Sequence, residues 1–485
     1  MAKNFTRRRF LACAGSAAAA AAAKATTDTR DARANATAGG ERPNIIVLVT
    51  DDQRWDALGC MRNPVIHTPN LDRLATDGVL FVNNFCTTSI CMVSRASIFT
   101  GLYKRSHKVD RFDQPLADPL FAHSYPVVLR DAGYRTGFIG KWGLGGALPE
   151  SAFDYFDGFP GQGKYFHEQD GSVVHLTTIM ADNAVEFLKG CSRDQPFCLS
   201  VSFKAPHVQD SDPRQFLYDP AFEHLYQDVA IPTAKTATQE YYDALPEFLK
   251  NTECRRRWQR RFATPEQAQQ SLKGYYRLVS GVDHALGRIR AALEQCGLSD
   301  NTVILLTGDN GFFLGERGLA GKWLMYEESI RTPLIIHDAR LPATLRGQRR
   351  EEMALNIDVA PTVLDLAGID IAMGVQGRSL VPLVKGRTVP WRTDWFYEHD
   401  YGPEELFPAV EGVRTGRWKY VRYVRREPDF EQLFDLANDP DEKHNLVSRE
   451  QYRAVLQKLR DRWAAWRDQL ERWQPGASER WHDPR

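Results

Sequence analysis

The sequence has no excess of charge of either sign, few cysteines, and no repeated or low-complexity segment beyond its first residues. Lys and Arg number 62, as do Asp and Glu, so no overall field attracts nucleic acid or an anionic membrane surface. The 8 cysteines form no CxxC pair, which excludes the usual zinc spacings and gives no disulfide framework. An anion that binds this protein must therefore be held by local groups.

The first 40 residues read as an export signal rather than as part of the fold. Thr6-Arg7-Arg8-Arg9-Phe10-Leu11 is typical of a twin-arginine signal, and an alanine-rich apolar stretch follows to Ala23. That stretch is too short for a good membrane span, so we expect no stable membrane insertion. These features predict recognition by the twin-arginine (Tat) export machinery and delivery to a bacterial periplasm or the medium. A basic cap on an ordinary helix is the alternative.

The rest of the chain alternates strands and helices as an α/β fold does. Apolar runs rich in β-branched residues, typical of strands buried on both faces of a parallel sheet, occur at 44–49 and 302–307. We predict a large mixed, mostly parallel sheet flanked by helices in residues 41–388, and a smaller C-terminal α+β subdomain in residues 389–485. Further strands are expected at 136–139, 197–203, 333–336, 394–398 and 418–424, and helices at 68–77, 176–188, 267–295 and 449–473.

Oxygen-bearing side chains follow both long apolar runs. Asp51 and Asp52 come after the first, and Asp309 and Asn310 after the second. Because open α/β sheets bind ligands outside the carboxyl ends of their strands, we expect the two pairs to share one site. Carboxylate and amide oxygens suit Ca²⁺ or Mg²⁺ rather than zinc. Helix capping is the alternative for each pair alone.

The stretch from Ser89 to Gly101, Ser-Ile-Cys-Met-Val-Ser-Arg-Ala-Ser-Ile-Phe-Thr-Gly, resembles the active-site signature of formylglycine-dependent sulfatases, a family of the alkaline phosphatase superfamily. The resemblance implies that a maturation enzyme oxidises Cys91 to formylglycine, whose hydrated aldehyde attacks sulfur. The two acidic motifs resemble the family's metal-ligand motifs. They imply one Ca²⁺ per chain, held by Asp51, Asp52, Asp309, Asn310 and the modified Cys91.

Four further residues match the family's sulfate site by their local sequence. Arg95 lies one helical turn after Cys91, where its guanidinium can hold the formylglycine oxygen. Lys141 in Gly-Lys-Trp and Lys322 in Gly-Lys-Trp-Leu resemble the two lysines that meet the sulfate. His207 in Ala-Pro-His resembles the histidine that faces the bridging oxygen. The resemblance implies that the lysines neutralise the sulfate and that His207 protonates the departing alcohol.

Two positions depart from the family pattern. Val93 stands where many members have Pro or Ala, and Gly143 stands where the Gly-Lys-Trp element often continues to a histidine. That histidine is thought to contact the formylglycine hydroxyl. Another group must take over its proton, or the step relies on water. His107 and His399 are candidates, although each also suits a structural or substrate-facing role.

The resemblance covers residues 43–470, because Leu433-Phe434-Asp435-Leu436 also matches the family's C-terminal signature. We therefore expect an exported, Ca²⁺-dependent sulfatase acting on sulfated carbohydrate, similar to bacterial N-acetylglucosamine-6-sulfatases and iduronate sulfatases. A phosphonate monoester or phosphodiester hydrolase and a non-catalytic glycan-binding protein are the alternatives. The arginine-rich segment at 255–261, within the irregular region 213–265, is interpreted as a solvated face or as part of a substrate-binding insertion.

Overall fold

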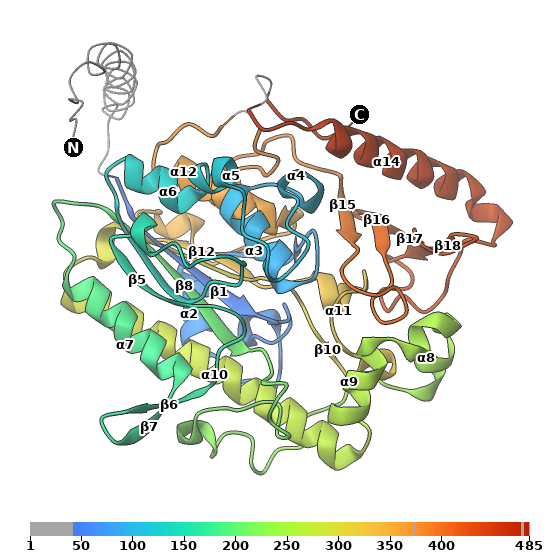
Figure 1. The fold of residues 1–485 in the computed structure, drawn as a ribbon, viewed down its shortest axis with the longest axis horizontal. Helices are drawn as coiled ribbons and strands as arrows, with labels where there is room; N and C mark the ends of the chain where they lie inside the picture. Colours follow the sequence, from blue (N-terminus) through green and yellow to red (C-terminus); the bar gives the residue numbers. More distant parts are fainter. Residues whose placement is uncertain (1–41, 373, 477–479, 485) are drawn as a thin grey trace, which may run out of the picture. The chain divides into compact units, whose positions relative to one another are not determined.

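An eight-stranded mixed sheet forms the centre of the structure (Figure 1). The computed structural model describes residues 42–372, 374–476 and 480–484, so the expected export signal lies outside the described residues. The strand order is β13-β2-β12-β9-β1-β8-β4-β5, and the five strands from β9 to β5 are parallel. In chain order the strands are β1 (Asn44–Asp51), β2 (Val79–Phe81), β4 (Arg135–Lys141), β5 (Tyr155–Phe159), β8 (Phe197–Pro206), β9 (Thr302–Gly308), β12 (Leu334–Asp338) and β13 (Gln348–Arg350).

Helices cover both faces of this sheet because its central strands are apolar on both faces. Along β1, Ile45 and Val47 belong to one buried cluster, whereas Ile46 and Leu48 belong to the other. In Figure 1, α7 and α10 lie along one face, and α3, α6 and α12 lie on the opposite side. The helices that pack on the sheet are α2 (Pro69–Asp77), α3 (Cys91–Thr100), α6 (Tyr125–Asp131), α7 (Leu176–Lys189), α10 (Pro265–Gln295) and α12 (Val359–Leu366).

A four-stranded antiparallel sheet follows the main sheet in the chain. Its order is β15 (Asp394–His399), β16 (Val410–Thr415), β17 (Trp418–Tyr423) and β18 (Phe430–Asp435). Helix α14 (Arg453–Arg472) is fixed to this sheet by the buried indole of Trp466, which donates a 2.6 Å hydrogen bond to Asp394 in β15. The described residues from Pro43 onward form one compact unit.

Short elements complete the described chain. Two-stranded pairs join β3 (Asn84–Phe85) to β14 (Ala354–Leu355), β6 (Phe166–Gln169) to β7 (Ser172–His175), and β10 (Phe313–Leu314) to β11 (Ala320–Gly321). The remaining α-helices are α4 (Lys104–His107), α5 (Asp118–Ala122), α8 (Gln239–Asp243), α9 (Glu253–Arg261), α11 (Glu327–Ile330) and α13 (Val381–Val384).

The predicted fold class is confirmed, since a mostly parallel sheet flanked by helices is accompanied by a small antiparallel sheet. The division at residue 388 stays a prediction. The arginine-rich segment 255–261 is helical and belongs to α9, with Arg261 buried. Its charge run is therefore only partly a solvated face.

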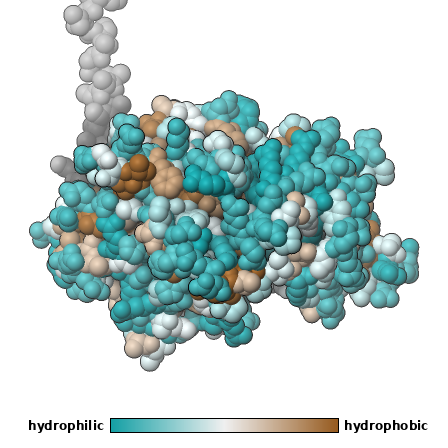
Figure 2. Space-filling model, turned by 90° about the horizontal axis from the view of Figure 1, so that it is seen from below, coloured by the Kyte–Doolittle hydropathy of each residue, from teal (hydrophilic) through white to brown (hydrophobic). Residues whose placement is uncertain are grey.

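The surface is mainly polar. Figure 2 shows hydrophilic residues over most of one face, with hydrophobic ones scattered among them. The large hydrophobic side chains that are exposed in the described chain are Phe112, Val173 and Val229. In residues 42–372, 374–476 and 480–484, no helix is both long and apolar enough to cross a bilayer.

Candidate active site

Both acidic pairs lie at the same edge of the sheet. Strands β1 and β9 are parallel neighbours, with Thr50 opposite Gly308, so Asp51 and Asp309 emerge side by side. The Asp309 amide donates a 2.9 Å hydrogen bond to the Thr50 carbonyl, and the Asp52 amide donates one of 3.2 Å to the Asp309 carboxylate. Carboxylate oxygens of Asp51, Asp52 and Asp309 lie within 4.8 Å of one another. All three side chains are buried.

This cluster fits a hard divalent cation. Among the described residues, Asp51 Oδ1, Asp52 Oδ2 and Asn310 Oδ1 are buried and accept no hydrogen bond. Buried polar atoms are rarely left without a partner, so three orphaned oxygens in one cluster indicate a ligand set. An all-oxygen set is what Ca²⁺ and Mg²⁺ prefer. Asp51 also groups with Cys91 and His207, whose ligand atoms lie within 4.8 Å of one another.

Cys91 is the first residue of α3 and is buried. Arg95 lies one turn later, and its Nη2 is 3.0 Å from Asp309 Oδ2 and 3.4 Å from Asp51 Oδ2. Its Nη1 donates a 2.9 Å hydrogen bond to the Lys141 carbonyl. The guanidinium therefore ties α3 to the ends of β1, β4 and the segment after β9.

Glycine is required at position 143 by the backbone and by Arg95. Gly143 has a φ of 78°, which favours glycine, and a Cβ there would lie 2.4 Å from Arg95 Cδ. A histidine at this position would have to displace Arg95. His107 and His399, the candidates to replace the histidine that is absent at position 143, are both neutral. Burial lowers the pKa of each to about 3.

Two ammonium groups converge on the carboxylates from different elements. Lys141 ends β4, forms an ion pair with Asp51 and donates a 2.8 Å hydrogen bond to Gln162. Lys322 follows β11, and its Nζ lies 2.5 Å from Asp52 Oδ1 and 3.0 Å from Cys91 Sγ. Both lysines are buried. The thiol of Cys91 is thus next to a cation.

His207 follows the last residue of β8. Its Nδ1 lies 2.7 Å from the Val208 carbonyl, so Nδ1 carries the proton that this bond requires. Nε2 is left free to face the cluster, 3.5 Å from Asp52 Oδ2. The Tyr165 hydroxyl donates a 2.6 Å hydrogen bond to the His207 carbonyl. The backbone and Nδ1 of His207 are therefore both fixed.

Charge and burial oppose one another in this cluster. Burial disfavours ionisation of Asp51, but Lys141, His207, Lys322 and Arg95 together hold its pKa well below the ordinary value. Burial and the nearby Asp51 raise the pKa of Asp309 to about 6.

Burial also raises the pKa of the Cys91 thiol and holds the pKa of His207 well below its usual range. Cys91 is therefore protonated near neutral pH and is a poor nucleophile as a thiol.

All of the predicted catalytic and metal-binding residues are brought together, although their chemical roles stay predictions. Sequence analysis missed Gln162, Tyr165 and Lys204. Lys204 donates a 3.1 Å hydrogen bond to the same Val208 carbonyl that His207 uses. Lys204 directly follows the apolar run 197–203, and a lysine at the end of a buried strand is unusual. This feature of the sequence could have pointed to Lys204. No sequence pattern marks Gln162, which reaches Lys141 from a turn.

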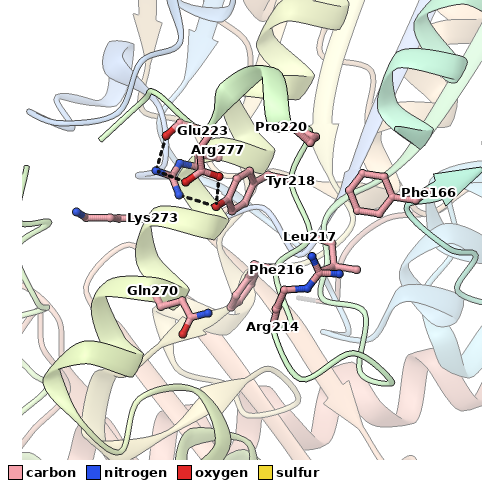
Figure 3. A pocket seen from close by; sticks show the side chains of 10 residues that line it. All are labelled: Phe166, Arg214, Phe216, Leu217, Tyr218, Pro220, Glu223, Gln270, Lys273 and Arg277. Atoms are coloured by element: carbon pink, nitrogen blue, oxygen red, sulfur yellow. Dashed lines mark hydrogen bonds and ion pairs between the residues drawn. The ribbon is translucent and has the colours of Figure 1, made fainter. Parts of the chain in front are cut away.

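One cavity of about 190 Å³ lies outside this cluster and contains none of its residues. Figure 3 shows Arg277 bonded to Tyr218 and Glu223 at one side, with Phe166 and Arg214 at the other. Arg277 donates hydrogen bonds of 2.8 Å to the Tyr218 hydroxyl and 2.7 Å to the Glu223 carbonyl. Its Nη2 also lies 3.6 Å from Glu223 Oε1, so its charge is already engaged by a carboxylate.

The buried carboxylates, cations and cysteine define a hydrolase of anionic esters, and comparison with known proteins gives the family. A sulfatase family model matches residues 43–369. A second model, N-sulphoglucosamine sulphohydrolase, C-terminal, matches residues 315–469. The chain therefore belongs to the sulfatase family and is an enzyme that hydrolyses sulfate esters. The predicted family and enzyme class are confirmed.

Several known proteins are similar over most of their length. An N-acetylglucosamine-6-O-sulfatase of Bacteroides thetaiotaomicron is 30% identical, over 85% of this chain and 84% of the relative. A choline-sulfatase of Rhizobium meliloti is 31% identical, over 84% and 82%. The structure of BT4656 with its substrate D-glucosamine-2-N,6-O-disulfate has a TM-score of 0.76 at 26% identity, covering 90% of this chain and 100% of that one. A phosphonate monoester hydrolase of Agrobacterium radiobacter shares the fold, with a TM-score of 0.74 at 24% identity over 88% and 96%.

Proposed function

We propose that the protein removes sulfate from sulfated carbohydrates, with formylglycine made from Cys91 as the nucleophile and one Ca²⁺ beside it. The observation that carries the proposal is the position of Cys91. Its sulfur lies 3.0 Å from Lys322 Nζ and within 4.8 Å of ligand atoms of Asp51 and His207. Burial and the nearby Asp51 outweigh the two lysines and raise the pKa of this thiol, so an unmodified Cys91 stays protonated and is a poor nucleophile.

The proposed cofactors supply the chemistry that the unmodified side chains lack. Ca²⁺ held by Asp51, Asp52, Asp309 and Asn310 would act as a Lewis acid toward a sulfate oxygen. Conversion of Cys91 replaces a thiol by an aldehyde, whose hydrate offers an oxygen nucleophile.

The remaining residues bind and orient the ester. Lys141 and Lys322 bring two positive charges to the place where the sulfate must lie, and they need not reorganise when charge develops there. Arg95, fixed by Asp51, Asp309 and the Lys141 carbonyl, holds the start of α3 in place. Charge neutralisation by the lysines and positioning of α3 by Arg95 both depend on burial, because burial excludes water and strengthens each charge interaction.

His207 is suited to move a proton at Nε2. Its Nδ1 proton is used in the bond to Val208, so Nε2 is the atom that faces the ester. The low pKa that burial imposes makes the imidazolium a strong acid once it forms. We infer that His207 passes a proton from Nε2 to the departing alcohol oxygen.

Sugar esters are favoured as substrates by the names of the relatives, among them an N-acetylglucosamine-6-O-sulfatase and a protein solved with D-glucosamine-2-N,6-O-disulfate. The twin-arginine pattern at 6–11 supports export, where sulfated polysaccharides are met. Export and the maturation enzyme that acts on Cys91 are both part of the proposal.

The test combines a mass measurement with an activity panel. The protein is produced with a formylglycine-generating enzyme, and the tryptic peptide 74–95 is weighed, since conversion replaces sulfur by oxygen and removes two hydrogens. Sulfate release is then measured by ion chromatography from N-acetylglucosamine 6-sulfate, other sulfated sugars and p-nitrophenyl sulfate, and release of phosphonate or phosphate is measured from phosphonate and phosphate esters. We expect conversion and a preference for a sulfated sugar.

Two cysteine variants separate the outcomes. Cys91→Ala should lose turnover while keeping its fold, and Cys86→Ala, altered in the same peptide, should be converted and active. A full-mass thiol at position 91 with glycan binding but no turnover would instead support the glycan-binding alternative. A preference for phosphonate esters would support the phosphonate hydrolase.

A further inference from the structure

Helix α9 places one arginine beside the proposed reaction centre. The Cys254 thiol donates a 3.0 Å hydrogen bond to the Lys322 carbonyl, which anchors the first turn of α9 next to a residue that contacts Cys91. One turn later, the guanidinium of Arg257 lies over the ring of Trp323, 4.9 Å from its centroid. Because Trp323 follows Lys322 directly in the chain, the Arg257 guanidinium lies beside the segment that borders the proposed active site.

Trp323 is held in an uncommon conformation. Its φ of 81° is left-handed, which is rare for a bulky residue and is typical of functional sites. The Tyr397 hydroxyl donates a 3.1 Å hydrogen bond to its carbonyl, and Phe407 packs edge-on against its ring. The surface under Arg257 is thus rigid, as a recognition wall must be.

Arg257 also reaches the loop that carries His207. Its Nη2 lies 3.5 Å from Asp210, three residues after His207, and Arg261 binds the other oxygen of Asp210 at 2.7 Å. His207 is proposed to face the bridging oxygen, so this loop borders the place of the leaving sugar. Burial disfavours the charge of Arg257, but Asp210, Glu253 and Asp52 raise its pKa, so the guanidinium stays charged.

Arg257 has donors to spare. Within the described part of the chain, only its Nε–H donates a hydrogen bond, 2.9 Å to Glu253. Its side chain is 17% exposed, so Arg257 is not sealed inside the protein. Helix α9 contains five arginines and one acidic residue, Glu253, so the helix carries an excess of positive charge. A neutral group would gain little from this environment.

We propose that Arg257 binds a second acidic group of the glycan, next to the sulfate ester that is cleaved. The inference rests on the proposed function, and it narrows the substrate to sugars with at least two acidic groups close together. A guanidinium recognises sulfate or carboxylate through paired N–H donors, which a lysine does not reproduce. Trp323 fixes the plane of that guanidinium.

The test compares two sugars that differ in one acidic group. The probes are D-glucosamine-2-N,6-O-disulfate and N-acetylglucosamine 6-sulfate, and a second pair joins glucosamine 6-sulfate to a uronic acid or to neutral galactose. We expect kcat/KM to be higher for the acidic member of at least one pair. Arg257→Gln should reduce that preference about tenfold, as expected for one lost charge-assisted hydrogen bond. Arg257→Lys should restore only part of it.

Arg256 gives the matched control, because it is the exposed neighbour in the same helix. Arg256→Gln removes the same charge and should leave the preference unchanged. Equal losses of preference in both variants would show that it comes from the overall positive charge of α9 rather than from Arg257, and would overturn the proposal. Equal kcat/KM values for both members of each pair in an active unaltered protein would overturn it too.

Binding measured without turnover keeps this proposal separate from the proposed function. Calorimetric titration of the Cys91→Ala protein with the same sugars gives the preference as a ratio of dissociation constants. If the unaltered enzyme releases no sulfate but the ratio falls in the double variant with Arg257→Gln, the proposed function fails and the acidic subsite stands. An unchanged ratio refutes the subsite whatever the turnover.

Discussion

Calcium should raise the melting temperature of this protein, and the size of the fold determines how large the shift is. The perturbation is removal of divalent ions with a chelator, followed by titration with CaCl₂. Asp51, Asp52 and Asp309 bring three carboxylates within 4.8 Å, and Asp51 Oδ1, Asp52 Oδ2 and Asn310 Oδ1 accept no hydrogen bond from the described chain. The unfolded chain cannot assemble this set, so calcium should bind the folded state alone and raise its stability.

The expected shift follows from linkage. A ligand at 100 times its Kd adds ~2.7 kcal/mol to the free energy of unfolding. An unfolding entropy of about 2.1 cal/mol/K per residue gives ~0.9 kcal/mol/K for roughly 440 residues. The melting temperature should therefore rise by about 3 °C at 100 times Kd, and by about 1.5 °C for each further tenfold increase in calcium.

Differential scanning calorimetry of the full chain measures this shift. Asp309→Asn should abolish the calcium-dependent part, whatever it does to the metal-free melting temperature. Asp283→Asn is the matched control, because Asp283 is also a buried carboxylate but bonds Leu71 and Asn70 in another part of the fold. A calcium shift that survives in Asp309→Asn, or is absent from the unaltered protein, would refute the ligand assignment.

Three further substitutions test other parts of the structure. His207→Gln should slow sugar sulfates more than aryl sulfates, whose leaving groups need no proton; equal losses in kcat/KM would argue against an acid role. Gly143→His should lower kcat/KM, because a Cβ would lie 2.4 Å from Arg95 Cδ, and a faster enzyme would contradict this. Arg392 Nη2 lies 2.6 Å from Oδ1 of the buried Asp358. Arg392→Met removes this ion pair and leaves the carboxylate buried alone, so the free energy of unfolding should fall by ~3–5 kcal/mol. An unchanged melting curve would show that the pair adds nothing.

Local sequence was sufficient for the elements that form the scaffold of the site. The apolar runs at 44–49 and 302–307 predicted two buried strands, and both exist, with acidic pairs at their carboxyl ends. Arg95 follows Cys91 by one turn because the segment is helical, as the spacing indicated. These features depend on neighbours in the chain, so periodicity and spacing report them directly.

Contacts between distant segments were beyond such reasoning. Sequence analysis left α9 open as a solvated face or an insertion, yet Cys254 anchors it to Lys322 and sets Arg257 over Trp323. Gln162 reaches Lys141 from a turn that no motif marks.

Composition, periodicity and motif order by themselves determined the α/β class, the two buried strands and the set of residues expected at their ends. Only the tertiary structure decided that Gly143 leaves no room for a histidine, since the obstacle is Arg95 from another element. It also decided which oxygens are left without partners. Chain spacing specifies what lies within a few residues, whereas burial and close approach arise only when segments far apart in sequence pack together.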